Sequence, residues 1–220
     1  MIESLRASAE ADALAQGVRA LGVVLPADAQ ARLIAYVELL AKWNRTYNLT
    51  AIREPARMIT HHVLDALAIL PLLPEVEGLR VLDVGSGGGV PGLPLAIARP
   101  DLRVTLLDAN SKKTTFLTQA AIELRTSNVD IATARVEAYE PPAPFDVIVS
   151  RAFSELGDFA AGAARHLAPG GVLAAMKGVH PHDEIAALPD DIEVTGVPAV
   201  RVPGLAADRH LVLMRPRSAP

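Results

Sequence analysis

The stretch that decides the fold is Val81-Leu82-Asp83-Val84-Gly85-Ser86-Gly87-Gly88-Gly89-Val90-Pro91-Gly92. An apolar run leads to the acid Asp83, and glycine then occupies four of the five positions 85–89. Glycine takes positive φ without steric cost and lets a ligand approach the main chain closely. The stretch therefore predicts a strand, a loop that cradles a cofactor, and a helix that follows.

Asp83 indicates which cofactor this loop holds. A carboxylate at this point would repel the pyrophosphate of a dinucleotide, whereas it suits a cationic ligand group. S-adenosylmethionine carries both an ammonium and a sulfonium, so we expect it to bind here, with Asp83, Gly85, Gly87 and Gly89 in its site. One alternative stays open, because residues 87–92 formally satisfy the weak G-x-G-x-x-G pattern of nicotinamide oxidoreductases.

Length and composition limit the class of protein. The 220 residues, half of them hydrophobic, suffice for one α/β domain with a modest appendage. The absence of cysteine excludes disulfides, thiolate metal sites and thiol nucleophiles, and it fits a cytoplasmic location. We expect no bound metal, no membrane span and no signal peptide, since residues 2–22 carry several charges. A net charge of −4 means that a nucleic acid would need a local basic patch.

The periodicity of apolar residues divides the chain into two parts. Residues 1–73 predict helices, the second from Asp28 to about Tyr47 and the third from roughly Pro55 to Leu70. The rest, residues 74–220, alternates strands and helices, which predicts a Rossmann-like α/β fold. Strands are expected near Arg80–Val84, Arg103–Asp108, Val129–Thr133, Phe145–Ser150, Gly171–Lys177, Ile192–Arg201 and His210–Arg215. Helices are expected near Gly92–Ala98, Lys112–Leu124, Leu156–His166 and Asp183–Leu188.

We therefore predict a seven-stranded, mostly parallel sheet in one structural unit, with the helical extension packed on it. The last two strands follow each other with only a loop between them, so they should form a hairpin with an antiparallel final strand. Pro169-Gly170-Gly171 is expected to be a structural turn between a helix and the fifth strand.

A second acid, Asp108, ends the next predicted strand 23 residues after Gly85. A carboxylate at this place can accept the ribose hydroxyls of an adenosine. The alternative is an acid that satisfies amides at the start of the helix after Ser111. The spacing favours the ribose role.

Two further motifs follow the third and fourth strands. Ala134-Arg135-Val136-Glu137 would border the adenine, or would be an ordinary turn. Ser150-Arg151-Ala152-Phe153 stands where many amine methyltransferases have an Asn/Asp-Pro-Pro-aromatic motif. Arg151 could pair with a surface acid, but its position at a strand's carboxyl end favours the site.

Two blocks resemble a known family: Trp43–Ile52 with its continuation His61–Leu67, and Asp83–Pro94. They are similar to the bacterial small-subunit rRNA guanine-N7 methyltransferases, also called the glucose-inhibited division protein B family. The resemblance implies a class I methyltransferase fold and methylation of guanine 527 of 16S rRNA, with S-adenosylhomocysteine as the second product.

The same resemblance implies that five residues bind S-adenosylmethionine: Gly85, Val90, Val136, Glu137 and Arg151. Two positions depart from the family pattern. Val90 stands where the family usually has Phe or Leu, which predicts looser packing. Ala66 stands where it usually has Ser, which removes a hydrogen bond expected there.

The residue types also limit the reaction. Guanine N7 has a lone pair and no proton, so it needs positioning and electrostatic stabilisation rather than a general base. The lack of cysteine excludes covalent methylation of a pyrimidine C5, and the lack of a Pro-Pro-aromatic motif disfavours exocyclic amines. A small-molecule O- or N-methyltransferase stays open, as does a cofactor-binding scaffold without catalysis.

A basic segment is the candidate RNA surface. It contains Lys42, Arg45, Arg53 and Arg57, and further candidates are Lys112, Lys113 and Lys177. The alternative for the segment is a solvated helix face. We expect a monomer that acts on 16S rRNA in a pre-folded particle of the small subunit, with no DNA or membrane partner.

The sequence does not decide the roles of four other side chains. His62 and Asp65 share a helix face, as a buried structural pair or as part of the cleft wall. Trp43 is expected in the core, and Phe153 is the better candidate for stacking on a base.

Overall fold

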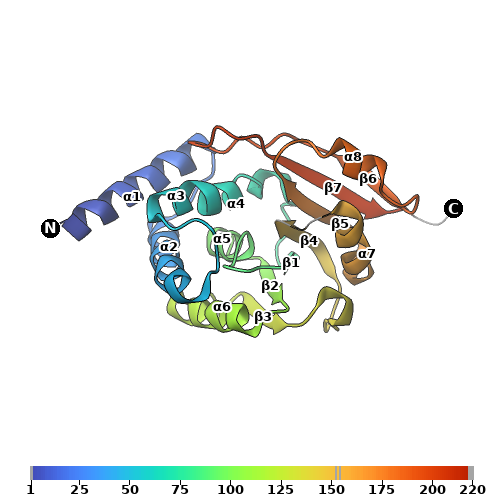
Figure 1. Ribbon diagram of the computed structural model, residues 1–220, viewed down its shortest axis with the longest axis horizontal. Helices are drawn as coiled ribbons and strands as arrows, with labels where there is room; N and C mark the ends of the chain where they lie inside the picture. Colours follow the sequence, from blue (N-terminus) through green and yellow to red (C-terminus); the bar gives the residue numbers. More distant parts are fainter. Residues whose placement is uncertain (1, 152, 154, 218–220) are drawn as a thin grey trace.

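The strands of the computed structural model, which describes residues 2–151, 153 and 155–217, form one seven-stranded sheet (Figure 1). The strand order is β3-β2-β1-β4-β5-β7-β6. All pairs from β3 to β5 are parallel, whereas β7 is antiparallel to both β5 and β6, as predicted. The strands are β1 (Arg80–Val84), β2 (Arg103–Asp108), β3 (Val129–Thr133), β4 (Phe145–Arg151), β5 (Leu167–Lys177), β6 (Ile192–Gly196) and β7 (His210–Pro216).

The helices cover both faces of the sheet, with α7 on the side opposite to α2, α5 and α6 (Figure 1). The α-helices are α1 (Ile2–Ala20), α2 (Ala27–Tyr47), α3 (Pro55–Met58), α4 (Asp65–Leu67), α5 (Gly92–Ala98), α6 (Ser111–Glu123), α7 (Leu156–Ala163) and α8 (His182–Ala186). A π-helical segment spans Ile59–Leu64, and 3-10 turns span Leu70–Leu72, Val136–Ala138 and Ala164–His166.

The strand β1 shows why the sheet needs helices on both faces. Val81 belongs to the hydrophobic cluster that α2, α5 and α6 share, while its neighbour Leu82 belongs to the cluster of α7. Both residues are fully buried. A strand that buries apolar side chains on both of its faces is typical of parallel sheets covered by crossover helices.

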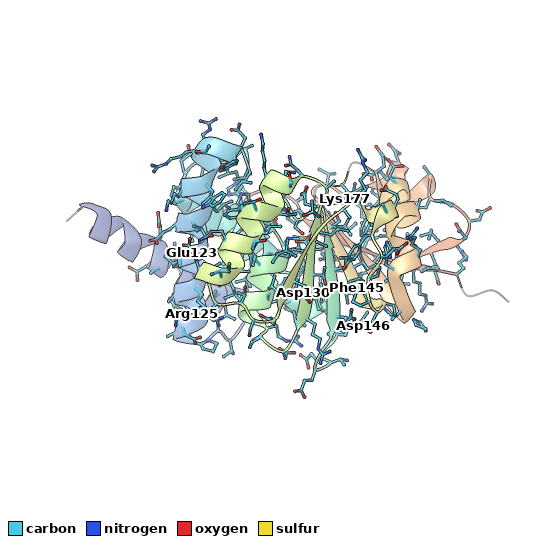
Figure 2. The ribbon with its side chains drawn as sticks, turned by 90° about the horizontal axis from the view of Figure 1, so that it is seen from below. Glu123, Arg125, Asp130, Phe145, Asp146 and Lys177 are labelled. Carbon is cyan, nitrogen blue, oxygen red and sulfur yellow. The ribbon has the colours of Figure 1, made fainter. Side chains whose placement is uncertain are left out.

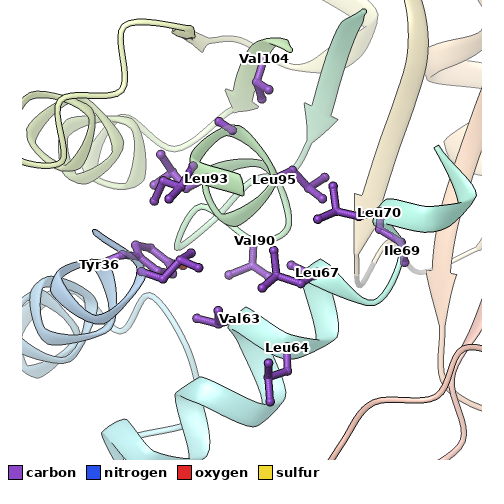
Figure 3. Packing of buried hydrophobic residues seen from close by; sticks show 14 of the residues in the cluster. Tyr36, Val63, Leu64, Leu67, Ile69, Leu70, Val90, Leu93, Leu95 and Val104 are labelled. Carbon is purple, nitrogen blue, oxygen red and sulfur yellow. The ribbon is translucent and has the colours of Figure 1, made fainter. Parts of the chain in front are cut away.

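The N-terminal helices pack on the helices that flank the glycine loop. Helix α2 contacts α5 and α6, and α4 contacts α5. Close by, Tyr36, Val63 and Leu67 surround Val90 (Figure 3). Burying a side chain of this size contributes about 1.5–3 kcal/mol. The extension is therefore continuous with the core around the loop.

The third helix, the fifth strand and the sixth strand differ from the sequence predictions. The third helix contains the π-helical segment, in which the Asp65 amide reaches back to the Thr60 carbonyl. Pro169-Gly170-Gly171 is part of β5 rather than a turn before it, because β5 pairs with β4 at Leu167 and again at Val172. The register shifts between these pairs, and Gly170 has a φ of 81°, so the motif forms a bulge.

The sixth strand is shorter than the predicted Ile192–Arg201, because it ends at Gly196. Pro198 follows soon after and has no amide to donate to a ladder. Beyond it, only an isolated bridge joins Ala199 to His210.

We expect Gly92→Ala to lower the free energy of unfolding by about 1–3 kcal/mol, because the added methyl group overpacks a full site. A Cβ at Gly92 would lie 2.8 Å from Asp83 Oδ2 and against the Leu106 side chain. Gly157→Ala in the first turn of α7 is the matched control, since nothing lies within 4 Å of its Cβ position. Urea denaturation measures both variants, and equal stability of the two would contradict the packing described here.

Candidate functional site

The glycine loop lies at the carboxyl ends of β1 and β2. Gly85 and Gly87 have φ values of 75° and 55°, and Gly89 also has a positive φ. Gly85 is exposed, and a side chain there would meet nothing within 4 Å. The loop therefore presents bare backbone on its open side, as a cofactor cradle requires.

Two aspartate side chains near the ends of β1 and β2 accept amides of the loop and of the helix that follows it. Asp83 Oδ2 accepts the amide of Gly92 at 2.9 Å, and Asp108 Oδ2 accepts the amide of Gly87, also at 2.9 Å. An intramolecular hydrogen bond typically contributes about 0.5–1.5 kcal/mol. Tyr36 adds a third support, because its hydroxyl donates to the Gly88 carbonyl at 2.6 Å. The sequence carries only a weak signal for this role of Tyr36, a polar tip on an apolar helix face.

Asp83 is completely buried. Burial raises the pKa of its carboxyl group to about 7, although the Gly92 amide opposes the shift. Within the described residues, Oδ1 has no hydrogen-bond partner. The Asp83 carboxyl group therefore supports the loop from inside the protein. The sequence pattern, an acid near the end of a strand before a run of glycines, does not distinguish this role from direct contact with a ligand.

Asp108 is nearly buried but lies at the end of its strand. Its Oδ1 accepts the Asn110 amide at 2.9 Å, and Lys113 Nζ lies 3.4 Å from Oδ2. An ionised carboxylate has about four acceptor positions. The carboxylate therefore satisfies one amide at the start of α6 and one in the glycine loop, and it keeps capacity to accept from a ligand hydroxyl.

Val90 and Val136 turn their side chains into the core. Val90 belongs to the cluster on the α2 side, and Val136 packs so closely on α7 that a Cβ at Gly162 would lie 2.8 Å from it. Only their backbone atoms could therefore meet a ligand. Glu137 is exposed beside Val136. Ala66 is completely buried.

Arg151, the last residue of β4, is joined to the N-terminal helices. Its Nη1 atom donates to the His61 carbonyl at 2.8 Å and lies 3.2 Å from His62 Nδ1 and 3.3 Å from Asp65 Oδ2. Burial, reinforced by Arg151, lowers the pKa of His62 to about 4, so its ring is neutral at pH 7. His62 Nε2 lies 2.8 Å from Thr50 Oγ1.

This cluster settles how His62 and Asp65 are placed: both are buried, and both contact the arginine at the carboxyl end of β4.

Ala152 of the motif after Ser150 lies outside the described residues. Phe153 packs on Phe159 with 5.6 Å between ring centroids, and Trp43 packs on Phe116 at the same distance. Trp43 is half-buried and packs against the main hydrophobic cluster, so it lies at the margin of the predicted core.

The basic residues fall into two groups. Lys42, Arg45, Arg53, Arg57 and Lys112 are exposed, and Arg57 lies 3.7 Å from Glu54. Lys177 is different, because its side chain is 13% exposed and forms a 2.7 Å ion pair with Glu184. Figure 2 shows Lys177 at the end of the strands that faces away from Asp130 and Asp146.

Within the residues that the structure describes, every helix is too short or too polar to cross a membrane. No group of three or more His, Asp or Glu side chains there is arranged to hold a metal ion.

Comparison with known proteins identifies a family. The model of the GidB family, described as rRNA small subunit methyltransferase G, matches residues 29–212. The ribosomal RNA small subunit methyltransferase G of Laribacter hongkongensis is 57% identical over 90% of this chain and 95% of that protein. The protein of the same name from Neisseria meningitidis is 53% identical over 93% and 97%.

Solved structures share the fold. A methyltransferase dependent on S-adenosylmethionine from Aquifex aeolicus has a TM-score of 0.56 at 19% identity, covering 79% of this chain and 97% of that one. TrmN from Thermus thermophilus has a TM-score of 0.54 at 24% identity, covering 69% and 48%. These similarities show a Rossmann-like methyltransferase fold, as predicted.

The raised pKa of Asp83 predicts a pH dependence of stability. The unfolded carboxyl group loses its proton near pH 3.8, whereas the folded one keeps it up to about pH 7. The stability from Asp83 is therefore fully present below pH 3.8 and is lost as the pH rises through 7. Asp83→Asn, which cannot ionise, should lack this loss.

The free energy of unfolding of the wild type minus that of Asp83→Asn should fall by about 1 kcal/mol per pH unit between pH 5 and 7. Urea denaturation at pH 5, 6, 7 and 8 measures it. Asp146→Asn is the control, because Asp146 also accepts a backbone amide, that of Arg80 at 2.8 Å. A difference that stays constant or grows with pH would contradict the burial argument.

Proposed function

Because the chain belongs to the rRNA small subunit methyltransferase G family, we propose that it methylates N7 of guanine 527 in 16S rRNA, with S-adenosylmethionine as the methyl donor. The family match over residues 29–212 carries this proposal, since it spans the glycine loop and the Arg151 cluster. Membership makes the chain a methyltransferase of 16S rRNA, so a nicotinamide oxidoreductase and a scaffold without catalysis are no longer alternatives.

The cofactor site is assigned to the loop and the two strand ends beside it. The exposed backbone at Gly85 and the remaining acceptor capacity of Asp108 suit a nucleoside with a cationic tail. Asp108 would accept the ribose hydroxyls, and Val136 and Glu137 would border the adenine. When bound, S-adenosylmethionine supplies a methyl group activated by its sulfonium.

The remaining task of the protein is to position guanine. N7 has no proton to remove, so no general base is needed, and the chain contains no cysteine for a covalent route. Arg151 is held by three contacts at the end of β4, beside β1. A donor fixed in this way can orient the substrate at no further entropic cost, and orientation alone can supply much of the rate enhancement.

The RNA surface is assigned to the exposed cations at the end of α2 and around α3. These are Lys42, Arg45, Arg53 and Arg57, with Lys112 and Lys113 on α6. Lys113 would then lie between RNA and Asp108, while Lys177 supports the site through its ion pair with Glu184. The protein would act as a monomer on the small subunit.

We expect Asp108→Ala to weaken S-adenosylmethionine binding more than tenfold, or about 1.4 kcal/mol or more, because the ribose hydroxyls lose a charged acceptor. Isothermal titration calorimetry measures the Kd. Asp146→Ala is the control, because Asp146 is partly buried and also accepts a backbone amide, that of Arg80 at 2.8 Å, at the opposite end of the strands. Unchanged affinity in Asp108→Ala would rule out the ribose role.

Methylation of small subunits that lack the modification tests the product. The purified protein and S-adenosylmethionine should produce 7-methylguanosine at position 527, measured by mass spectrometry of nuclease fragments of 16S rRNA. Methylation of another nucleotide, or of another atom of guanine 527, would refute the assignment.

A further inference from the structure

Two arginines share one buried carboxylate at the edge of the sheet. Asp65 on α4 is 3% exposed, and its Oδ2 and Oδ1 lie 3.3 Å from Arg151 Nη1 and 2.9 Å from Arg209 Nε. Arg209 directly precedes β7. The carboxylate therefore fixes two guanidinium groups that are far apart in the sequence.

The strand register brings both arginines to the edge that carries the glycine loop. Arg151 pairs with Met176 of β5, and Met176 pairs with Leu211 of β7. Arg209 precedes Leu211 by two residues, at the point where the antiparallel strand β7 begins. The carboxyl ends of β4 and β5 therefore meet the start of β7 here.

The cluster carries one net positive charge, because two guanidinium groups face one carboxylate and His62 is neutral at pH 7. The side chains of Arg151 and Arg209 remain 25% and 24% exposed. Arg209 also lines a cleft of about 590 Å³, together with Arg201 and His210. The planar guanidinium has five donors, of which Arg209 uses Nε toward Asp65 and Nη1 toward the Asp208 carbonyl.

We propose that Arg151 and Arg209, clamped by Asp65, form a phosphate-binding pair that holds the RNA backbone beside the target guanine. This inference rests on the proposed function. A fixed pair of guanidinium groups matches the geometry of a phosphodiester. Asp65 is a positioning residue in this scheme, and Arg209 is the residue that contacts RNA from the cleft side. The carboxylate of the cofactor is the competing anion that the test must separate.

The first test is the salt dependence of RNA binding by Arg209→Gln, with unmethylated small subunits as the probe. The loss of one phosphate contact should make the negative slope of log association constant against log salt concentration shallower by about 0.7–0.9. It should also weaken binding about tenfold near 0.1 M salt. Arg215→Gln is the matched control: Arg215 lies at the other end of β7 and also donates from Nε to a carboxylate, Glu193, at 3.0 Å. It should keep the wild-type slope and activity.

The second test uses the sign of a charge change. Asp65→Asn makes the cluster more positive, so charge alone would tighten RNA binding, whereas loss of the clamp should weaken it and lower kcat/KM at least tenfold. Asp65→Glu keeps the charge and should restore part of this loss. Tighter RNA binding by Asp65→Asn, with normal kcat/KM, would overturn the proposal.

Further readouts separate the alternatives. S-adenosylhomocysteine should bind Arg209→Gln with wild-type affinity, and a selective loss of that affinity would assign the pair to the cofactor carboxylate instead. Arg209→Lys keeps the charge and the reach to Asp65, so it should melt like the wild type and keep its salt slope. If the wild type methylates guanine 527 but Arg209→Gln has the slope of Arg215→Gln, this inference fails while the proposed function stands.

Discussion

Hydrogen bonds from two loop amides to two strand-end carboxylates are the interaction on which the site depends. Asp83 takes the amide that opens α5, and Asp108 takes the amide of Gly87. Because β1 and β2 are parallel neighbours in register, with Asp83 opposite Leu106, the two acids reach the loop from adjacent strands. The two acids accept the amides that point into the protein, and the exposed side of the loop stays open for a ligand.

The N-terminal helices complete the site rather than merely cover the core. Tyr36 fixes the Gly88 carbonyl, and the cluster around Val90 packs the far side of the loop. From the same part of the chain, His61, His62 and Asp65 fix the guanidinium of Arg151. The glycine loop and the arginine at the carboxyl end of β4 are thus positioned by one set of helices.

Much of this architecture could be predicted from sequence, because it follows from local patterns. The runs Arg80–Val84 and Arg103–Asp108 form strands at the predicted bounds, and the hairpin of β6 and β7 was indicated by two runs without a helix between them. The parts that were missed depend on distant partners. Asp65 contacts a residue 144 positions away, and nothing local to Arg209 indicates that contact. The bulge at Gly170 likewise depends on how β4 pairs with β5, since Pro-Gly-Gly by itself also suits a turn.

A crystal structure of the protein with S-adenosylhomocysteine would test the central claim most directly, that the loop and its two acids form the cofactor site. We expect ribose hydroxyls within hydrogen-bond distance of Asp108, the amino-acid tail over the exposed backbone of Gly85, and the Gly92 amide still bonded to a buried Asp83. An adenosine bound elsewhere, or bound here with Asp108 out of reach of the ribose, would contradict it.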